Sequence, residues 1–341
     1  MDQLKIAIIG AGTWGENHAR IYNEHPFAEV VAICDLNLEK AQKTAARTNI
    51  PNVYNDYNEM LKNCDIDAVA IVTPDFAHGD AAVAAANAKK HMLIEKPLAT
   101  NREDVFRILE AIEKNNVRAM VDFHNRWNPP FNAAHQAVER GELGDVYSGY
   151  FRLNDRKWVA TDLLPWAAKS SILWFLGSHS LDTLRWLFSD EVVRVYSVSR
   201  SGILKELGVD TVDTYYTTLE FKKGGIAHME NGWVTPNGNP CINDMKCNIL
   251  GTKGMISIDA SNHNLIQKCT DSIMEVPDIL VQNLVQGYAK GFAFESVRSF
   301  VDRMLDGKPF GLTLQDAANT TMVLLAIMES AKTRTPVDVK Y

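Results

Sequence analysis

The chain has 341 residues, of which 46 % are apolar and 23 % charged, an ordinary composition for a globular protein. This length exceeds that of a usual single core, so we expect two domains. The net charge of −7 and the lack of a basic run argue against an extended nucleic-acid surface.

No targeting or membrane segment is predicted. The N-terminus has no signal-peptide pattern, and apolar runs such as Met322–Met328 are too short to cross a bilayer. The five cysteines form no C-x-x-C pair and fit no common zinc pattern. We therefore expect reduced thiols, no bound metal and a cytoplasmic location.

In the first part of the chain, strand-like and helix-like patterns alternate. Their short connections predict a doubly wound parallel sheet, an α/β Rossmann domain over residues 1–123, with ligands at the carboxyl ends of the strands. The expected strands are Lys5–Ile9, Glu29–Cys34, Ala68–Val72, His91–Ile94 and Arg118–Phe123. The expected helices are Glu16–His25, Leu38–Thr48, Asn58–Lys62, His78–Lys90 and Arg102–Asn115.

Pro129 and Pro130 interrupt this alternation, so we place the domain boundary nearby and assign residues 124–341 to a second domain. Successive strand patterns there predict an α+β domain with an antiparallel sheet packed on helices. The expected strands are Val146–Leu153, Val192–Val198, Asp213–Phe221, Ile226–Trp233, Lys246–Leu250 and Met255–Asp259, with hairpin turns at residues 222–225 and 251–254. Helices Phe292–Leu305 and Leu314–Lys332 close the chain and can pack back on the first domain.

The first strand breaks at Gly10-Ala11-Gly12-Thr13-Trp14-Gly15, a G-x-G-x-x-G turn that opens a helix. Gly10 permits the tight turn, Gly12 leaves room for a pyrophosphate beside the backbone, and Gly15 lets the helix lie close to the strand. Amides at the helix N-terminus then face phosphate oxygens. The turn predicts a dinucleotide site.

Asp35 closes the second strand, twenty residues after Gly15. A carboxylate there accepts hydrogen bonds from the adenosine ribose hydroxyls and repels a 2′-phosphate. Because Leu36, Asn37 and Leu38 follow and bring no positive charge, we predict NAD over NADP. The alternative is a solvated aspartate at a strand end.

Glu95-Lys96-Pro97 follows the fourth major strand, where the reactive end of a cofactor lies. A lysine there can hydrogen-bond a substrate hydroxyl and stabilise the alkoxide that forms as hydride leaves, with its pKa lowered by desolvation. The alternative is a surface lysine paired with Glu95.

A helix near residue 180 places His179, Asp182 and Trp186 on one face and leucines on another. Ser178 is the expected N-cap, so His179 lies in the first turn, where the helix dipole favours neutral imidazole. A structural histidine is the alternative.

These motifs, together with Thr73-Pro74-Asp75, His78 and the segment Phe123–Pro129, resemble the glucose-fructose oxidoreductase / inositol dehydrogenase (Gfo/Idh/MocA) family over nearly the whole chain. The resemblance implies a Rossmann domain, a second domain on a large open, mostly antiparallel sheet, and NAD(P)-dependent chemistry at a CH–OH or C=O carbon of a sugar, cyclitol or derivative. The implied cofactor contacts are Gly10, Gly12, Thr13, Trp14, Gly15, Asp35, Thr73, Pro74, His78, Glu95 and Lys96.

The resemblance also implies that Lys96 polarises the substrate hydroxyl and that His179 transfers the proton. Many polyol-oxidising members carry an aspartate four residues before this histidine, where this chain has Phe175. Asp182, Asp155 or Asp162 can replace it, or proton transfer can rest more on Lys96.

Substrate contacts are expected from the segment Phe151–Trp166 and from Asp182. Trp158 can stack on the apolar face of a sugar, and Arg126 or Arg156 can bind a hydroxyl or carboxylate. The alternative is a solvated loop with a packed tryptophan.

Two rival functions remain: a non-catalytic regulator that senses NAD or a sugar, and a dehydrogenase or reductase of a non-sugar substrate such as a dihydrodiol. An open sheet exposes a face that needs a cover, so we expect a homodimer or homotetramer formed through that sheet.

Overall fold

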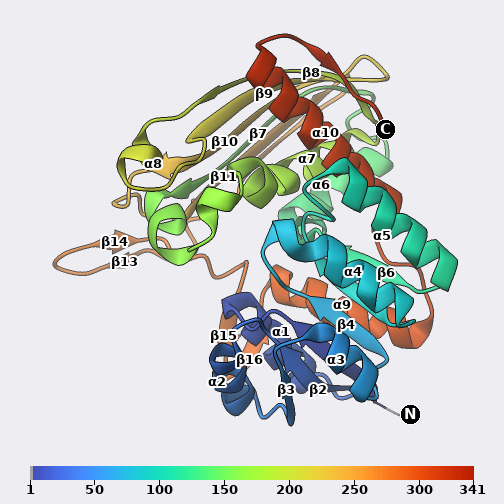
Figure 1. Cartoon of the computed structure of the whole chain (residues 1–341). Helices are drawn as coiled ribbons and strands as arrows, with labels where there is room; N and C mark the ends of the chain where they lie inside the picture. Colours follow the sequence, from blue (N-terminus) through green and yellow to red (C-terminus); the bar gives the residue numbers. More distant parts are fainter. Residues whose placement is uncertain (1–2) are drawn as a thin grey trace. The chain divides into compact units, whose positions relative to one another are not determined.

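The computed structural model describes residues 3–341 and divides into two compact units (Figure 1). The first unit runs to Trp127 and also contains Leu280–Thr321, and the second contains Asn128–Ile279 and Met322–Tyr341. The chain thus returns to the first unit after completing most of the second. None of the helices in the described part of the chain is long and apolar enough to cross a membrane.

The first unit is built on a six-stranded parallel sheet with the strand order β3-β2-β1-β4-β5-β6. This is the doubly wound topology, in which the strand order changes direction between β1 and β4. The strands are β1 (Leu4–Ile9), β2 (Ala28–Cys34), β3 (Asn52–Tyr54), β4 (Ala68–Ile71), β5 (His91–Glu95) and β6 (Ala119–Asp122). The helices are α1 (Thr13–Glu24), α2 (Leu38–Thr48), α3 (Tyr57–Asn63), α4 (His78–Asn87), α5 (Arg102–Asn115) and α9 (Phe292–Asp306).

The parallel sheet predicted for the first domain is confirmed, apart from the unpredicted β3, whose three residues are too few to show a period. Strand register brings Ile9 of β1 opposite Cys34 of β2 and Ile71 of β4. The turn that follows β1 therefore lies between the ends of these two neighbours, at the topological switch point where such sheets bind ligands.

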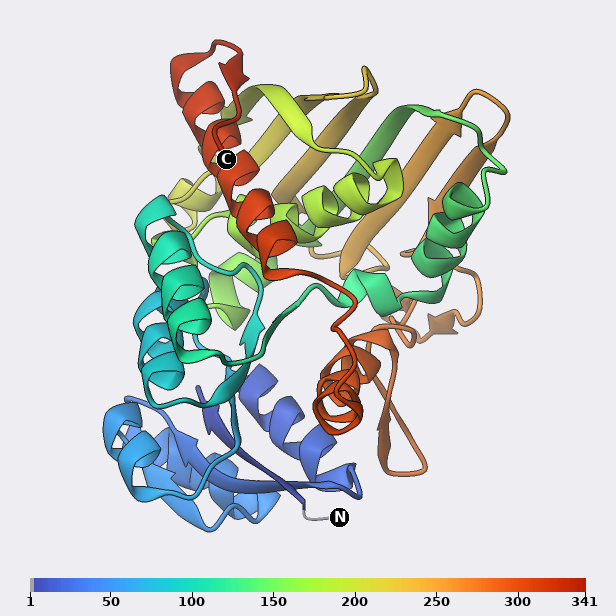
Figure 2. The same cartoon turned by 90° about the vertical axis from the view of Figure 1, so that its right-hand side faces the viewer.

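The late helix α9 completes the core of the first unit. Its residues Phe294, Val297, Phe300 and Val301 are buried in one cluster with the side chains of β1. Figure 2 shows α9 and the hairpin of β15 (Asn283–Val285) and β16 (Tyr288–Lys290), both orange, beside the blue helix α1.

The second unit is built on a seven-stranded sheet with the order β12-β11-β7-β10-β9-β8-β17. Neighbouring strands are antiparallel except β7 and β10, which run parallel, so the predicted mostly antiparallel sheet is confirmed. The strands are β7 (Val146–Arg156), β8 (Val192–Arg200), β9 (Thr214–Phe221), β10 (Ile226–Thr235), β11 (Asn243–Gly251), β12 (Met255–Asp259) and β17 (Val337–Asp338). A separate hairpin joins β13 (Lys268–Cys269) to β14 (Met274–Glu275).

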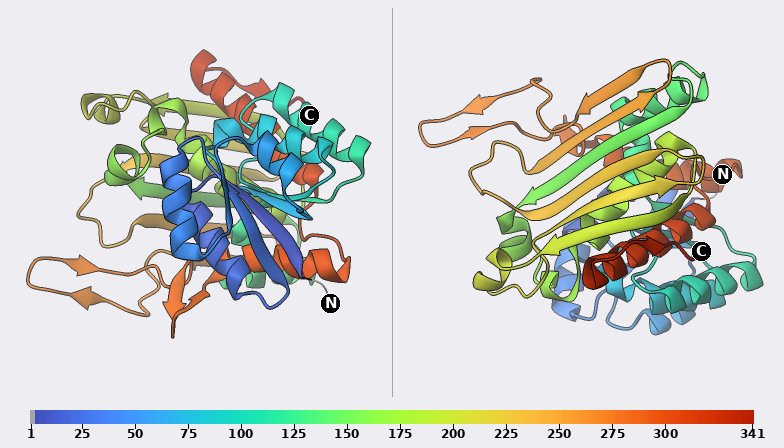
Figure 3. Two further views of the ribbon diagram at one scale, coloured as in Figure 1. Left: turned by 60° about the horizontal axis from the view of Figure 1, so that its bottom comes forward. Right: turned by 90° about the horizontal axis from the view of Figure 1, so that it is seen from above.

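Helices cover one face of this sheet and leave the other open (Figure 3, right). Along β9, buried and exposed residues alternate, as expected for a sheet with one covered face. The covered face packs against α6 (Pro129–Glu139), α7 (Ser178–Phe188) and the second half of α10 (Leu314–Thr333). A short helix, α8 (Ile203–Glu206), lies in the connection from β8 to β9.

The prolines that marked the domain boundary also start a helix. Pro129 and Pro130 occupy the first two positions of α6, where the missing amide hydrogens cost nothing because they would have no intrahelical partner. The two prolines were predicted only to interrupt the chain, and the helix α6 that they start was not predicted.

Candidate functional site

The glycine turn after β1 has the shape that a bound dinucleotide requires. Gly10 has a φ of 109°, and a Cβ added there would lie 2.3 Å from the carbonyl oxygen of Val72. A Cβ on Gly15 would lie 1.9 Å from the carbonyl oxygen of Gly10. Gly12 differs, since its added Cβ meets only the Lys40 ammonium, at 3.6 Å. Gly10 and Gly15 are thus needed to form the turn, whereas Gly12 keeps its outer side open.

Asp35 lies beside this turn, at the end of β2. One carboxylate oxygen accepts a hydrogen bond from the Ala11 amide at 2.9 Å, and the other accepts one from the Asn37 amide at 2.9 Å. Lys40, in the first turn of α2, brings its ammonium to 3.4 Å from Asp35. Lys40 lies beyond the three residues after Asp35 on which the preference for NAD over NADP was predicted.

The loops that follow β4 and β5 are joined through His78. Its Nδ1 lies 2.8 Å from the carbonyl oxygen of Pro97 and its Nε2 lies 3.1 Å from that of Thr73. The ring is fully buried, so this geometry favours a positioning role over the direct cofactor contact expected from the sequence. It fixes Thr73 and Pro74 relative to the Lys96-Pro97 turn, whose peptide bond is cis.

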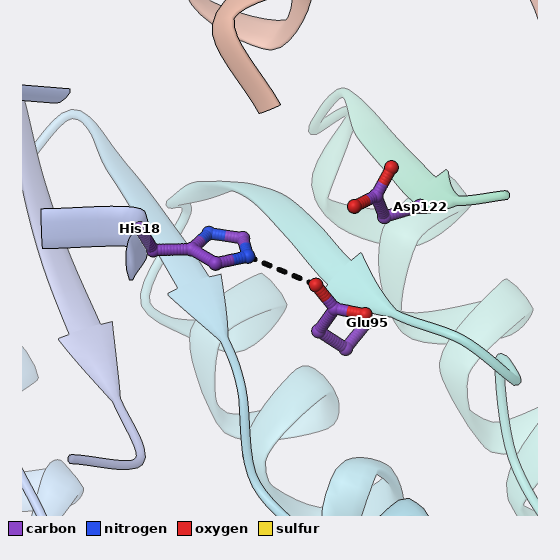
Figure 4. Close-up of side chains that lie close together, drawn as sticks. All are labelled: His18, Glu95 and Asp122. Carbon is purple, nitrogen blue, oxygen red and sulfur yellow. Dashed lines mark hydrogen bonds and ion pairs between the residues drawn. The ribbon is translucent and has the colours of Figure 1, made fainter. Parts of the chain in front are cut away.

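Glu95, the last residue of β5, is held by two residues of α1. His18 Nε2 lies 2.9 Å from a Glu95 oxygen (Figure 4), and the same oxygen accepts a hydrogen bond from the Trp14 indole. Burial disfavours the charge of Glu95, but the hydrogen bond and charge of His18 lower its pKa below the ordinary value. His18 therefore has a structural role, because its fully buried ring holds Glu95, while Trp14 joins the glycine turn to Glu95.

Two further titratable groups follow: Asp122 is fully buried opposite Glu95 on β6, and His124 is half-buried in the turn after that strand. Burial, and then the charge of Glu95, raises the pKa of Asp122 well above its ordinary value. Ser296 of α9 donates a hydrogen bond to this carboxyl group. Burial lowers the pKa of His124 to about 4. None of these residues was predicted as a site residue, although His124 belongs to the segment Phe123–Pro129 that carries part of the family resemblance.

The side-chain ligand atoms of His18, Glu95 and Asp122 lie within 4.8 Å of one another, a spacing compatible with a metal ion. Each of the three already takes part in a hydrogen bond, to another member or to Ser296. These bonds explain the cluster, and we assign it no metal.

Lys96 follows Glu95 at the carboxyl end of the sheet and is half-buried. Burial is the largest effect on Glu95 and Asp122 and favours their neutral forms; the positive charge of Lys96 opposes it at both groups, but the pKa of Asp122 stays raised. The alternative of a surface lysine paired with Glu95 alone does not describe this site, because the charge of Lys96 affects both Glu95 and Asp122 and both are buried.

In the second unit, His179 lies inside a longer helical segment than expected. A π-helical turn, Leu173–Gly177, runs directly into α7, and the Ser178 hydroxyl donates to the carbonyl oxygen of Trp174 at 2.8 Å. The prediction of Ser178 as N-cap was wrong because the chain was already helical before it. His179 is therefore not in the first turn of the helical segment, so the positive end of a helix dipole does not act on it as expected.

Phe175, at the position of the expected aspartate, belongs to an aromatic cluster. Its ring centroid lies 5.6 Å from that of Trp233 and 6.1 Å from that of Trp166. Of the proposed replacements, Asp182 is fully buried on α7, one turn after His179. Asp155 accepts a hydrogen bond from Asn243, and Asp162 accepts one from Thr161.

The predicted substrate residues fall in both units. In the first, Arg126 donates to the carbonyl oxygen of Gly311 at 3.2 Å. In the second, Arg156 donates to the carbonyl oxygen of Cys241 at 3.0 Å, and half-buried Trp158 follows the end of β7. Asp182 and His179 share α7, whereas Lys96 belongs to the first unit.

Two family descriptions match the chain in succession. "Oxidoreductase family, NAD-binding Rossmann fold" matches residues 4–123, and "GFO/IDH/MocA C-terminal domain" matches residues 131–257. The first match gives NAD as the cofactor, and the open side of Gly12 leaves room for the pyrophosphate of a dinucleotide.

Similar proteins cover nearly the whole chain. Myo-inositol 2-dehydrogenase of Thermotoga maritima is 24 % identical over 96 % of both chains, and the uncharacterized oxidoreductase YrbE of Bacillus subtilis is 28 % identical over 80 % of this chain and 79 % of its own. The crystal structure of scyllo-inositol dehydrogenase from Lactobacillus casei has the same fold, with a TM-score of 0.85 and 22 % identity over 99 % of both chains. The resemblance noted in the sequence is thereby confirmed, and the chain belongs to the Gfo/Idh/MocA family of NAD-binding oxidoreductases.

Proposed function

We propose that this oxidoreductase moves a hydride between NAD and a CH–OH or C=O carbon of a sugar, cyclitol or related polyhydroxylated compound. The observation that carries the proposal is the position of Lys96. It follows β5, which pairs with β4 beside the dinucleotide switch point, and adjoins Glu95, which α1 holds in place. Relatives named as inositol dehydrogenases support the substrate class.

In this proposal, NAD supplies the hydride acceptor and the chain supplies the proton chemistry. The Lys96 ammonium donates a hydrogen bond to the substrate oxygen and stabilises its negative charge as the C–H bond breaks. His179 takes the hydroxyl proton. In the reverse direction both residues help to protonate the carbonyl oxygen.

Phe175 changes the expected support of His179, because a phenyl ring cannot accept a hydrogen bond from imidazole as a carboxylate does. We propose Asp182 as the first replacement to test, since it lies on the same helix and is fully buried. If Asp182→Asn leaves turnover unchanged, proton transfer rests on Lys96 without this support.

The test is the absorbance of reduced nicotinamide while sugars, cyclitols and sugar acids are offered with NAD. Lys96→Met is expected to lower kcat by about a hundredfold or more while the protein still binds NADH, with any loss of NADH affinity reporting the cofactor contact of Lys96. Lys114→Met, on the exposed end of α5, serves as the control and should keep full turnover. Full turnover in Lys96→Met would overturn the proposed role of Lys96.

Two other outcomes would replace the proposed function by another. Tight NADH binding with no turnover across the panel would favour the non-catalytic regulator. Turnover of a non-sugar compound such as a dihydrodiol, but of no polyol, would keep the enzyme and replace the substrate class.

The open face of the second unit's sheet supports an assembly of identical chains. Tyr196, Val198 and Tyr216 are each more than two-fifths exposed on neighbouring strands β8 and β9. Apolar surface of this kind gains free energy when another chain covers it. We therefore propose a homodimer or homotetramer through this sheet, and a monomer in light scattering at micromolar concentration would refute it.

A further inference from the structure

At the adenosine end of the cofactor site lies a positive charge, the Lys40 ammonium, for which no role has been given above. Asp35, the expected partner of the ribose hydroxyls, forms an ion pair with Lys40 at 3.4 Å. The Lys40 ammonium is also the atom nearest to the open side of Gly12, at 3.6 Å from an added Cβ. It thus lies between the ribose carboxylate and the turn that receives the pyrophosphate.

Local structure fixes the stem of Lys40 in this direction. Asn37 caps α2 by accepting a hydrogen bond from the Lys40 amide at 3.1 Å, and the Asn37 amide in turn donates to Asp35. The Lys40 side chain is half exposed, so its ammonium can move toward a ligand without a large burial cost.

The other positive charges of α2 are engaged elsewhere. Lys43 pairs with Glu39 at 2.6 Å, and Arg47 pairs with Glu16 at 2.6 Å. Lys40 is therefore the cation of this helix that faces Asp35.

A carboxylate alone at this position rejects a 2′-phosphate through charge repulsion. A lysine beside it compensates part of that repulsion and can pair with the phosphate directly. We propose that Lys40 is a specificity-determining residue that gives the site affinity for the 2′-phosphorylated dinucleotide NADP(H), with NAD(H) still preferred. The proposal depends on cofactor binding alone and not on the roles of Lys96 and His179.

The experiment measures the Kd of NADH and of NADPH by nucleotide fluorescence, without substrate, in the full chain. Lys40→Met should raise the Kd for NADPH about fivefold or more and that for NADH less than twofold, because only NADPH carries the extra phosphate. Lys40→Arg should keep NADPH binding. Lys43→Met is the matched control, since it removes a cation from the same helix that pairs with Glu39 instead of Asp35.

Salt supplies an independent readout. In the wild type, added salt should weaken NADPH binding more steeply than NADH binding, and this difference should shrink in Lys40→Met. Three results would overturn the proposal: no measurable NADPH binding by the wild type, equal losses for both cofactors in Lys40→Met, or equal losses of NADPH binding in Lys40→Met and Lys43→Met. Equal losses for both cofactors would place Lys40 at the shared pyrophosphate.

Discussion

Replacing each of two glycines in the nucleotide turn by alanine should separate folding from cofactor binding. Gly12 has a φ of −72° and a ψ of −175°, a conformation that alanine adopts, and the added methyl group meets only a lysine ammonium at 3.6 Å. Alanine reduces the conformational freedom of the unfolded chain, which stabilises the folded protein, but it is a poorer N-cap residue than glycine, which destabilises it. These effects nearly offset, so we expect a stability change of about 0.5 kcal/mol or less and a Tm within about 2 °C of the wild type.

Cofactor binding should respond differently. In Gly12→Ala the methyl group occupies the open side of the turn, where overpacking costs about 1–3 kcal/mol. The Kd for NADH should therefore rise about five- to 150-fold. In Gly15→Ala the methyl carbon would lie 1.9 Å from the Gly10 oxygen, so the turn itself must shift and the Tm should fall by about 3 °C or more.

Thermal unfolding followed by circular dichroism and NADH titration by fluorescence measure the two effects on the same samples. A Gly12→Ala protein that binds NADH as tightly as the wild type would refute the assignment of Gly12 to the pyrophosphate. A Gly15→Ala protein with an unchanged Tm would refute the close approach of α1 to the turn.

Two further predictions concern stability. Burial lowers the pKa of His124 from its ordinary value of 6.5 to about 4, so the unfolded chain takes up the proton first as the pH falls. Stability should be lost between these values, by about 3 kcal/mol in total, and His124→Asn should reduce this pH dependence in chemical unfolding curves. Glu191→Ala removes two hydrogen bonds, at 2.9 and 2.7 Å, that the buried guanidinium of Arg185 donates. It should lower the free energy of unfolding by about 2 kcal/mol, less than for a fully buried pair, because Glu191 itself is partly exposed. Asp338→Ala, which breaks the exposed pair with Arg194, should cost less than about 0.5 kcal/mol, and equal losses in the two variants would contradict this distinction.

The sequence was most informative where a local pattern determines the structure. Strand and helix periods predicted the parallel sheet, and the glycine spacing predicted the turn at its switch point. Local pattern failed where helices join without a break, as before Ser178, and where prolines begin a helix, as at Pro129. A cap and a helix interior can carry the same residues, so only the preceding backbone distinguishes them.

Contacts between side chains were harder to predict than helices and strands. Lys40 reaches Asp35 across the cap at Asn37, so the pair could not be found from the three residues directly after Asp35. Ser296 reaches Asp122 only because residues 280–321 return to the first unit. The sequence gives no sign that Ser296 and Asp122, which are far apart in the chain, form a hydrogen bond.

The buried contacts of Glu95 connect the nucleotide turn with Lys96. Trp14 and His18 lie on the helix that begins at the glycine turn, and both contact the same Glu95 oxygen. Glu95 precedes Lys96 in the chain, so the position of this lysine depends on where α1 begins. His18 is fully buried, so its hydrogen bond to Glu95 is shielded from water. A change that displaces α1 should therefore impair both NAD affinity and the chemistry at Lys96, whereas a change on the outer side of the turn, as in Gly12→Ala, should impair affinity alone.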